Sequence, residues 1–288
     1  MKSKHWFAFI LLGAIWSSSF MWIKIALYEV DPVTLVAFRV LFGLLFGAGV
    51  LVIRRIKVPK EFKTWIPLIV LGITNLAIPF FLIAWGERSI DSSVAAILDS
   101  TVPLFTIFLA HFLLKDDRLT LLKILGLVIG FSGVVVLLSK NIGAVSSTIP
   151  GQAAVILASV FYAGSGVYVR RTTQDIQPIL RSIGPLLSAS VIMWATVFLT
   201  NNSVPVPQLE ITWIALLFLG VIGSGVAFIL AFYLIHEIGP TRTSMVTYIF
   251  PLGGVILGVI FLNEQITWQL IAGGILIVSS LIIAGRAD

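Results

Sequence analysis

Long apolar runs separated by short polar connections make up almost the whole chain. An α-helix needs about 20 apolar residues to cross the hydrocarbon core of a bilayer. Runs of that length predict membrane-spanning helices at residues 5–27, 32–53, 64–86, 92–114, 121–139, 150–170, 177–200, 212–235, 241–262 and 268–285. The longest connections, 54–63, 140–149 and 200–211, are too short for a soluble domain. The pattern therefore predicts an all-α integral membrane protein with ten transmembrane helices.

Composition supports a membrane protein and excludes several other classes. The chain is 58% hydrophobic and 11% charged, with a mean hydropathy of +1.07, which is far from the composition of a soluble domain. A net charge of +6 would suit nucleic-acid binding, but the basic residues lie in short connections where membrane topology explains them. With no cysteine, the chain has no disulfide and no thiolate metal site.

The two halves of the chain repeat each other. The sequence Thr-Trp-Ile at residues 64–66 recurs at residues 212–214, an offset of 148. The same offset pairs Gly72 with Gly220, Phe80 with Phe228, Trp85 with Tyr233 and Pro103 with Pro251, and an offset of 146 pairs Trp16 with Tyr162, Ser19 with Ser165, Lys24 with Arg170 and Pro32 with Pro178. Because each copy holds five spans, the second copy crosses the bilayer in the opposite orientation. We predict two inverted five-helix repeats, residues 1–145 and 146–288, as in secondary transporters with a site between the halves.

Lysine and arginine concentrate on one side of the predicted membrane. The residues on this side are Lys2, Lys4, Arg54, Arg55, Lys57, Lys60, Lys63, Lys115, Arg118, Lys123, Arg170, Arg171, Arg181, Arg242 and Arg286, which are 15 of the 19 basic residues. Short connections rich in basic residues stay in the cytoplasm. We therefore expect a multi-pass protein of the cell (inner) membrane with both termini in the cytoplasm.

Three prolines predict breaks in the middle of spans. Pro79, Pro103 and Pro251 each lack an N–H and leave the carbonyl four residues earlier without its helical partner. In a bilayer such a carbonyl must find another partner or line a polar cavity. The three carbonyls belong to Asn75, Asp99 and Thr247, of which the last two are equivalent in the repeat. Prolines are also common in membrane helices without a special role, but a matched pair beside polar residues favours functional kinks or gates.

Asp99 and Arg39 are the charged residues that we expect at a binding site. Asp99 lies seven residues into a span, where a carboxylate is costly unless it faces a cavity or a partner. We expect it to take up a proton or to pair with an ammonium group of the substrate; the alternative is a structural hydrogen bond to a neighbouring helix. Arg39 lies about two turns into the second span. It would bind a substrate carboxylate with its planar fork, pair with Asp99, or snorkel to the outer interface.

Other polar residues within the spans have plainer interpretations. Asn75 is less costly to bury than a charge, and would contact either the substrate or a neighbouring helix. Lys24 lies near a helix end and is expected to snorkel to the interface. Glu87 and Arg88 end the third span and are expected to form a pair at its outer rim. The histidines within spans have no partners at metal-ligand spacing, so we predict no metal site.

Aromatic residues near mid-membrane suggest the wall of a pocket. Trp16 and Tyr162 are equivalent in the repeat and lie in mid-span beside small polar residues such as Ser19, and Tyr248 lies next to the break expected at Thr247. Ring faces and hydroxyl tips at this depth suit an amphipathic solute; the alternative is the interfacial aromatic belt. The residues that we expect to contact substrate are Trp16, Ser19, Arg39, Asn75, Asp99, Tyr162 and Tyr248.

Three stretches of the sequence resemble a known family. Residues 92–106, Ser-Ser-Val-Ala-Ala-Ile-Leu-Asp-Ser-Thr-Val-Pro-Leu-Phe-Thr, resemble the fourth helix of EamA-type members of the drug/metabolite transporter superfamily, and residues 126–133 and 251–264 resemble the fifth and ninth helices. The resemblance covers the whole chain as two five-helix units. It implies a ten-helix basket with a central cavity, alternating access, and transport, often outward, of amino acids, other metabolites or drugs. Such proteins often have asparagine where this chain has Asp99, which suggests a cationic group on the substrate or proton coupling.

These features together predict a secondary active transporter. We expect an exporter of small amphipathic metabolites such as amino acids, with alternating access around a mid-membrane cavity. No nucleotide-binding motif is present, so a gradient or the solute itself must supply the energy. The alternatives are proton-coupled efflux of cationic drugs, uptake of metabolites, or a pore; an enzyme is disfavoured, because Asp116-Asp117 is the one acidic pair. We expect no cofactor and no nucleic-acid partner, and a monomer or homodimer in the lipid bilayer that binds a small-molecule substrate and, in the coupled alternative, protons.

Overall fold

The computed structural model describes residues 3–113, 120–139, 148–200, 206–238, 243 and 245–285. The repeat boundary predicted at 145–146 lies outside these ranges and stays a prediction. The Asp116-Asp117 pair also lies outside them, together with five of the basic residues that indicated the orientation: Lys2, Lys115, Arg118, Arg242 and Arg286.

Ten helical segments of the described residues are long and apolar enough to cross a membrane. In the first half they are α1 (Ser3–Ala26), α2 (Pro32–Ile53), α3–η1–α4 (Phe62–Leu71, Gly72–Ala77, Ile78–Glu87), α5–α6 (Ser92–Asp99, Val102–Leu113) and α7 (Leu121–Ser139). In the second half they are α8 (Thr148–Thr172), α9 (Pro178–Thr200), α10–η2–α11 (Glu210–Leu217, Phe218–Val226, Ala227–Ile238), η3–α13 (Met245–Tyr248, Ile249–Leu262) and α14 (Trp268–Gly285). The prediction of an all-α membrane protein with two inverted five-helix repeats is confirmed.

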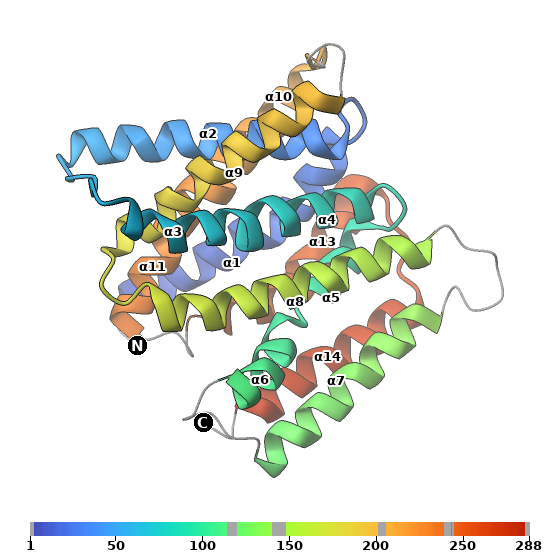
Figure 1. Cartoon of the computed structure of the whole chain (residues 1–288). Helices are drawn as coiled ribbons and strands as arrows, with labels where there is room; N and C mark the ends of the chain where they lie inside the picture. Colours follow the sequence, from blue (N-terminus) through green and yellow to red (C-terminus); the bar gives the residue numbers. More distant parts are fainter. Residues whose placement is uncertain are drawn as a thin grey trace.

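The start of α1 and the end of α14 lie at the same end of the bundle (Figure 1). The α2–α3 connection (residues 54–61) and the α8–α9 connection (residues 173–177) lie there as well. We call this the termini end. The connections at residues 27–31, 88–91, 206–209 and 263–267 lie at the opposite end, because each span reverses the direction of the chain; we call it the far end.

Four of the ten segments depart from regular α-helix within the bundle. The π-helical segments η1 and η2 are equivalent in the repeat at the offset of 148. A turn at Ser100 and Thr101 separates α5 from α6, and the 3₁₀ turn η3 precedes α13. Pro79, Pro103 and Pro251 follow three of these irregularities within a few residues. A role of the three prolines in gating stays a prediction.

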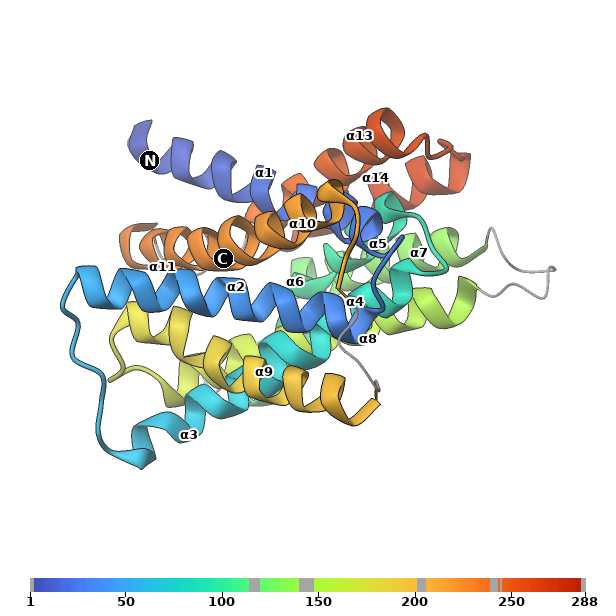
Figure 2. The ribbon, with the colours of Figure 1, turned by 90° about the horizontal axis from the view of Figure 1, so that it is seen from above.

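The two halves interleave and share one core. The most extensive helix contacts join α7 with α14, α2 with α9, α4 with α8 and α1 with α13, and each of these pairs takes one helix from each half (Figures 1 and 2). The core likewise combines fully buried side chains of both halves, such as Leu35, Leu98, Leu216 and Leu234. Neither half therefore forms a separate body with a core of its own.

Glycines bring some of these paired helices into backbone contact. A Cβ atom at Gly86 in α4 would lie 2.7 Å from the carbonyl oxygen of Gly151 in α8, and a Cβ at Gly151 would lie 2.8 Å from the carbonyl oxygen of Gly86. Real Cβ atoms do not approach oxygen so closely. Small residues at such positions are how membrane helices gain van der Waals contact when lipid is as apolar as the protein.

Gly86→Ala is expected to lower stability, because the new methyl group would press against the backbone of α8. Gly164→Ala is the matched control: a Cβ there meets no atom within 4 Å, so the better helix former is neutral or stabilises by up to about 1 kcal/mol. The midpoint of thermal unfolding in detergent, followed by circular dichroism, measures the difference. Equal midpoints for the two variants would contradict the close contact of α4 with α8.

Candidate substrate-binding site

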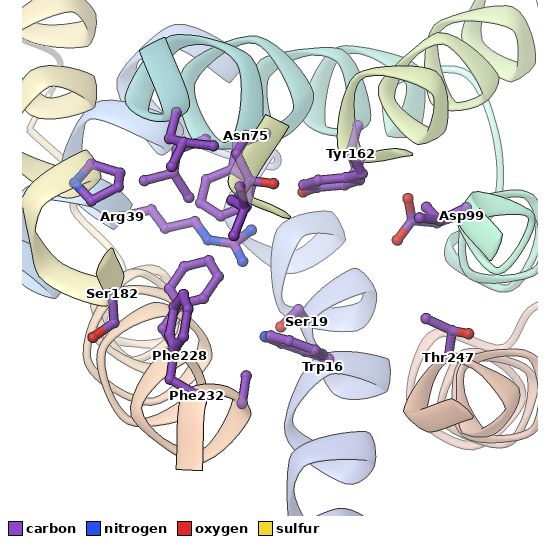
Figure 3. A pocket seen from close by; sticks show the side chains of 18 of the residues that line it. Trp16, Ser19, Arg39, Asn75, Asp99, Tyr162, Ser182, Phe228, Phe232 and Thr247 are labelled. Carbon is purple, nitrogen blue, oxygen red and sulfur yellow. The ribbon is translucent and has the colours of Figure 1, made fainter. Parts of the chain in front are cut away.

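A cavity of about 290 Å³ lies in the middle of the bundle, with walls from both halves (Figure 3). Six of the seven predicted contact residues line it: Trp16, Ser19, Arg39, Asn75, Asp99 and Tyr162. The structure therefore brings together residues from five spans that are far apart in the sequence. Whether these residues touch substrate stays a prediction.

Arg39 forms one wall of the cavity. Its side chain is 5% exposed, and its Nε donates a hydrogen bond of 3.1 Å to the hydroxyl of Ser224 in η2. The guanidinium lies 3.7 Å from the centre of the Phe80 ring, a cation–π contact. No other hydrogen bond of this guanidinium is recorded within the described ranges, so its terminal nitrogens remain available to a bound group. The snorkelling alternative is wrong, because the side chain points into the cavity (Figure 3).

The π-helical segment η2 also holds Trp16. The indole Nε1 donates a hydrogen bond of 3.2 Å to the carbonyl of Gly223, one residue before the Ser224 that holds Arg39. A π-helical turn is wider than an α-turn and often marks a functional site. Two side chains of the first half are thus positioned by one irregular segment of the second half. Neither Gly223 nor Ser224 was singled out from the sequence.

Asp99 forms the opposite wall. It ends α5 at the break before Pro103, is 6% exposed, and its Oδ1 has no hydrogen-bond partner among the described residues. Thr247, its equivalent in the second copy, lies across from it, and Tyr162 lies between Asp99 and Arg39 (Figure 3). No ion pair joins Asp99 to Arg39 in the described structure, so one positive and one negative group face the same cavity from different sides.

Aromatic rings line the cavity between Arg39 and Asp99. Trp16 meets Phe228 and Phe250 edge to face, with ring centres 6.1 and 6.2 Å apart, and Phe232 also lines the cavity. Nothing in the apolar pattern of their spans marks these phenylalanines as site residues. The repeat could have indicated Phe228, because it is equivalent to Phe80, whose ring contacts the Arg39 guanidinium.

Tyr248 does not line the cavity, contrary to expectation. Its hydroxyl donates a hydrogen bond of 2.7 Å to the carbonyl of Leu281 in α14. Successive side chains on the η3 turn point in different directions, and it is Thr247 that faces the cavity. The prediction therefore placed the cavity at the right turn, but at Tyr248 in place of Thr247.

The cavity reaches from mid-bundle toward the termini end. Its lining there includes Val169 near the end of α8, Arg181 and Ser182 in the first turns of α9, and Ile235 in α11. On the other side the lining stops at Ile23 and Ile83, which are 2% and 4% exposed. The structure thus shows a cavity that is sealed toward the far end.

Two glutamates at the far end bond across the halves. Glu264, after α13, accepts hydrogen bonds from the N–H and hydroxyl of Ser92, both 2.7 Å, and from the N–H of Ser93 at 3.0 Å. It therefore caps α5 of the first half. Glu29, after α1, accepts from the N–H groups of Gln208 at 2.9 Å and Leu209 at 3.0 Å, just before α10 of the second half. A carboxylate at a helix N-terminus is stabilised by free N–H groups and the helix dipole, so these contacts favour a closed far end.

Lys24 and Glu87 depart from the expectations at this end. The Lys24 ammonium donates to the carbonyls of Glu87 and Ile90 at 2.6 and 2.8 Å, which ties α1 to the end of α4. It does not snorkel to the interface. Glu87 is fully buried whereas Arg88 is exposed, and no ion pair joins them in the part of the chain described. The expected rim pair is wrong, because adjacent residues on a helix point to different faces.

A family model described as the EamA-like transporter family matches residues 4–139 and 149–286. The chain belongs to this family. The match falls once on each half, as expected for a protein built from two EamA-like units. Together with ten segments able to span a membrane, it identifies a multi-pass membrane transporter.

Similar proteins share this description over most of their length. "Uncharacterized transporter YoaV" of Bacillus subtilis is 25% identical over 276 residues, which is 93% of this chain and 92% of that protein. "Uncharacterized inner membrane transporter YedA" of Escherichia coli K12 is 26% identical over 253 residues, 87% and 80% of the two chains. A crystal structure covering 99% of this EamA-like chain and 98% of its own has a TM-score of 0.71 at 20% identity, which shows the same fold.

The Glu29 contact predicts a pH dependence of far-end closure. The Thr212 hydroxyl and the N–H groups of Gln208 and Leu209 lower the pKa of Glu29, and desolvation acts in the opposite sense. A group with a lowered pKa contributes stability that is lost as pH falls through that value. The contact should therefore persist from about pH 7 to about pH 5 and weaken only below the ordinary glutamate range.

A cysteine at Ile83 would report this closure, because the chain has no other cysteine. Labelling of Ile83→Cys from the far side should stay low down to the ordinary glutamate range and rise below it. In Glu29→Gln the labelling at neutral pH should be higher, and the part of the acid response due to Glu29 should vanish. An identical pH profile with and without Glu29 would remove its role in closure.

Proposed function

We propose that this transporter exports small zwitterions, amino acids with apolar or aromatic side chains in particular, by secondary transport through the bacterial cytoplasmic membrane. The observation that carries the proposal is the pair of opposite charges on opposite walls of one cavity. Arg39 offers free guanidinium nitrogens and Asp99 an unpaired oxygen. A zwitterion satisfies both groups in one molecule, which a monocation or a monoanion does not.

The rest of the cavity suits the same class of solute. The substrate carboxylate binds the guanidinium fork of Arg39, its ammonium group binds Asp99, and its side chain lies against the rings of Trp16, Tyr162 and Phe228. A volume of about 290 Å³ lies at the lower limit for pockets that bind drug-sized molecules. Size therefore favours an amino acid over a large cationic drug.

The orientation and the closed far end support export as the direction of transport. Basic residues cluster at the termini end, among them Arg54, Arg55, Lys57 and Lys60 in the α2–α3 connection and Lys63 in the first turn of α3, so we place that end in the cytoplasm. The cavity then loads from the cytoplasm, and release requires that the far-end contacts break while the termini end closes. Interleaved helices favour moving bodies that combine helices of both halves, in place of one half rocking against the other.

Vesicle transport assays with matched variants test the proposal. We expect Arg39→Gln and Asp99→Asn each to lower uptake of leucine and phenylalanine at least about tenfold, since each leaves a buried charged group of the substrate unpaired. Arg88→Gln, on an exposed residue, and Asp91→Asn, whose side chain makes no cap bond, are the controls and should transport normally.

Modified substrates separate the two roles. A methyl ester lacks the carboxylate, so any transport of it should be insensitive to Arg39→Gln. An N-acetyl derivative lacks the ammonium group and should be insensitive to Asp99→Asn. Better transport of cationic amines than of amino acids by the wild type would favour drug efflux, and normal amino-acid transport by both variants would refute the proposed site.

A further inference from the structure

A second buried carboxylate lies outside the cavity, at the far end. Glu87 is 0% exposed, and neither Oε1 nor Oε2 has a hydrogen-bond partner in the described residues. It is not among the residues that line the cavity. A carboxylate that is ionised, buried and without donors is strongly destabilised, so this group must be compensated in some way.

The neighbouring charges do not compensate it. Of the charged groups that act on Glu87, Lys24 on α1 and Arg39 on α2 are positive, and Asp99 on α5 and Glu264 after α13 are negative. Two anions thus oppose the two cations, and no donor reaches the carboxylate in the described residues. The Lys24 ammonium donates hydrogen bonds to the backbone carbonyls of Glu87 and Ile90, and no ion pair joins it to the Glu87 carboxylate in the described structure.

The packing of α4 against α8 adds no further cation. The charged residues of α8 are Arg170 and Arg171, at the termini end. A metal ion would need several oxygen ligands, but the carbonyls of Glu87 and Ile90 are already occupied by Lys24, and the described residues contain no cluster of metal-binding side chains. The remaining ligand that suits a single carboxyl group is a proton.

We propose that Glu87 is a proton-binding site of the far-end closure, occupied while that end is shut. When the far end opens, water reaches the carboxyl group, the O–H bond breaks, and the proton passes to water. The carboxylate then attracts the Lys24 ammonium away from the carbonyls of α4 and holds the end open. The proton enters and leaves on the far side, so lowering the pH of that side from alkaline to neutral favours closure, whereas the Glu29 contact is lost only below the ordinary glutamate range. The closure itself does not depend on the identity of the substrate, but its role in transport rests on the proposed function.

Infrared spectroscopy tests the protonated carboxyl group without any substrate. In the purified protein we expect a C=O stretching component of a buried carboxylic acid that is shifted by Glu87→Asp, lost in Glu87→Gln and retained in Asp99→Asn. Glu264→Gln is the matched control and should keep the band, because Glu264 accepts three hydrogen bonds. An infrared spectrum in this region that is the same in Glu87→Gln and the wild type, or no band in the wild type, would overturn the proposal.

Labelling of Ile83→Cys from the far side tests the consequence. It should rise several-fold as the far side is made alkaline from neutral pH, and stay low over the same alkaline range in Glu87→Gln. The same alkaline response in Glu87→Gln and wild type would exclude Glu87 as the sensor. Failure of amino-acid transport with an intact band and an intact alkaline response would refute the proposed substrate but leave this site in place.

An independent observation concerns the termini end. The starts of α3 and α10 are equivalent in the repeat and have the same local structure: Trp65 Nε1 donates to the carbonyl of Pro59 at 3.1 Å, and Trp213 Nε1 donates to that of Pro207 at 3.1 Å. They differ in one respect. Glu29 accepts hydrogen bonds from the N–H groups of Gln208 and Leu209 just before α10, whereas the equivalent N–H groups of Lys60 and Glu61 before α3 have no side-chain acceptor in the described part of the chain.

The repeat supplies a candidate for the missing acceptor. At the offset of 146 that pairs Trp16 with Tyr162, Glu29 corresponds to Asp175 in the α8–α9 connection. Asp175 is exposed and lies at the termini end, where the cavity is not sealed. Inverted repeats exchange conformations between the two faces of a transporter. We infer that Asp175 binds the N–H groups of Lys60 and Glu61 before α3 when the termini end closes, as Glu29 binds those of Gln208 and Leu209 before α10 in the structure, with the charges of Lys60 and Lys63 adding attraction.

Two cysteine pairs test this inference in a chain without native cysteines. The pair Glu29→Cys and Gln208→Cys should crosslink when the far end is closed, as in the structure. The pair Asp175→Cys and Lys60→Cys should crosslink when the termini end is closed. Glu264→Gln, which weakens the far-end closure, should lower the yield of the first pair and raise that of the second. A second pair that never crosslinks, or two yields that change in the same direction, would contradict the inference, whatever the substrate proves to be.

Discussion

The candidate site depends on two hydrogen bonds between the halves, from Trp16 to the carbonyl of Gly223 and from Arg39 to the hydroxyl of Ser224. A bilayer offers no water to a free carbonyl, so a non-helical turn persists there only where the protein supplies a partner. In η2 the partners are the side chains that shape the cavity. The irregular backbone of η2 and the geometry of the cavity therefore depend on each other. In a regular helix the carbonyl of Gly223 would bond within the helix and could not orient the Trp16 indole.

Interleaving of the halves constrains how such a site can change its access. Each major helix pair joins one copy to the other, and α4 and α8 touch through glycine backbone, so the copies cannot part without exposing their common core. The contacts that can break at a low cost in free energy lie at the far end, where Glu264 and Glu29 bind N–H groups at helix starts of the opposite half. These carboxylates are partly exposed and can exchange such bonds for water, which places the mobile contacts at the ends and the permanent ones in the middle.

The sequence predicted the spans, the inverted repeat and the convergence of Trp16, Arg39 and Asp99, because apolar length, self-similarity and the cost of buried charge are properties of single segments. It did not predict which face of a helix each residue takes. Glu87 was expected at the rim and is buried, and Tyr248 was chosen where Thr247 lines the cavity. The η2 segment also escaped notice, because the first copy marks its π-helix with Pro79 and the second has Ala227 at that position.

Duplication explains the scaffold but not the chemistry of the cavity. The π-helical segments, the tryptophan contacts at helix starts and the breaks near Asp99 and Thr247 occur in both copies. The two charges of the cavity occur in the first copy alone. Asp99 is equivalent to Thr247, and Arg39 corresponds to Pro185 at the offset of 146. A symmetric pair of carboxylates or guanidinium groups would repel across so small a space. A solute with two different ends requires one of each, so the positions where the copies diverge are those where selectivity for a zwitterion would arise.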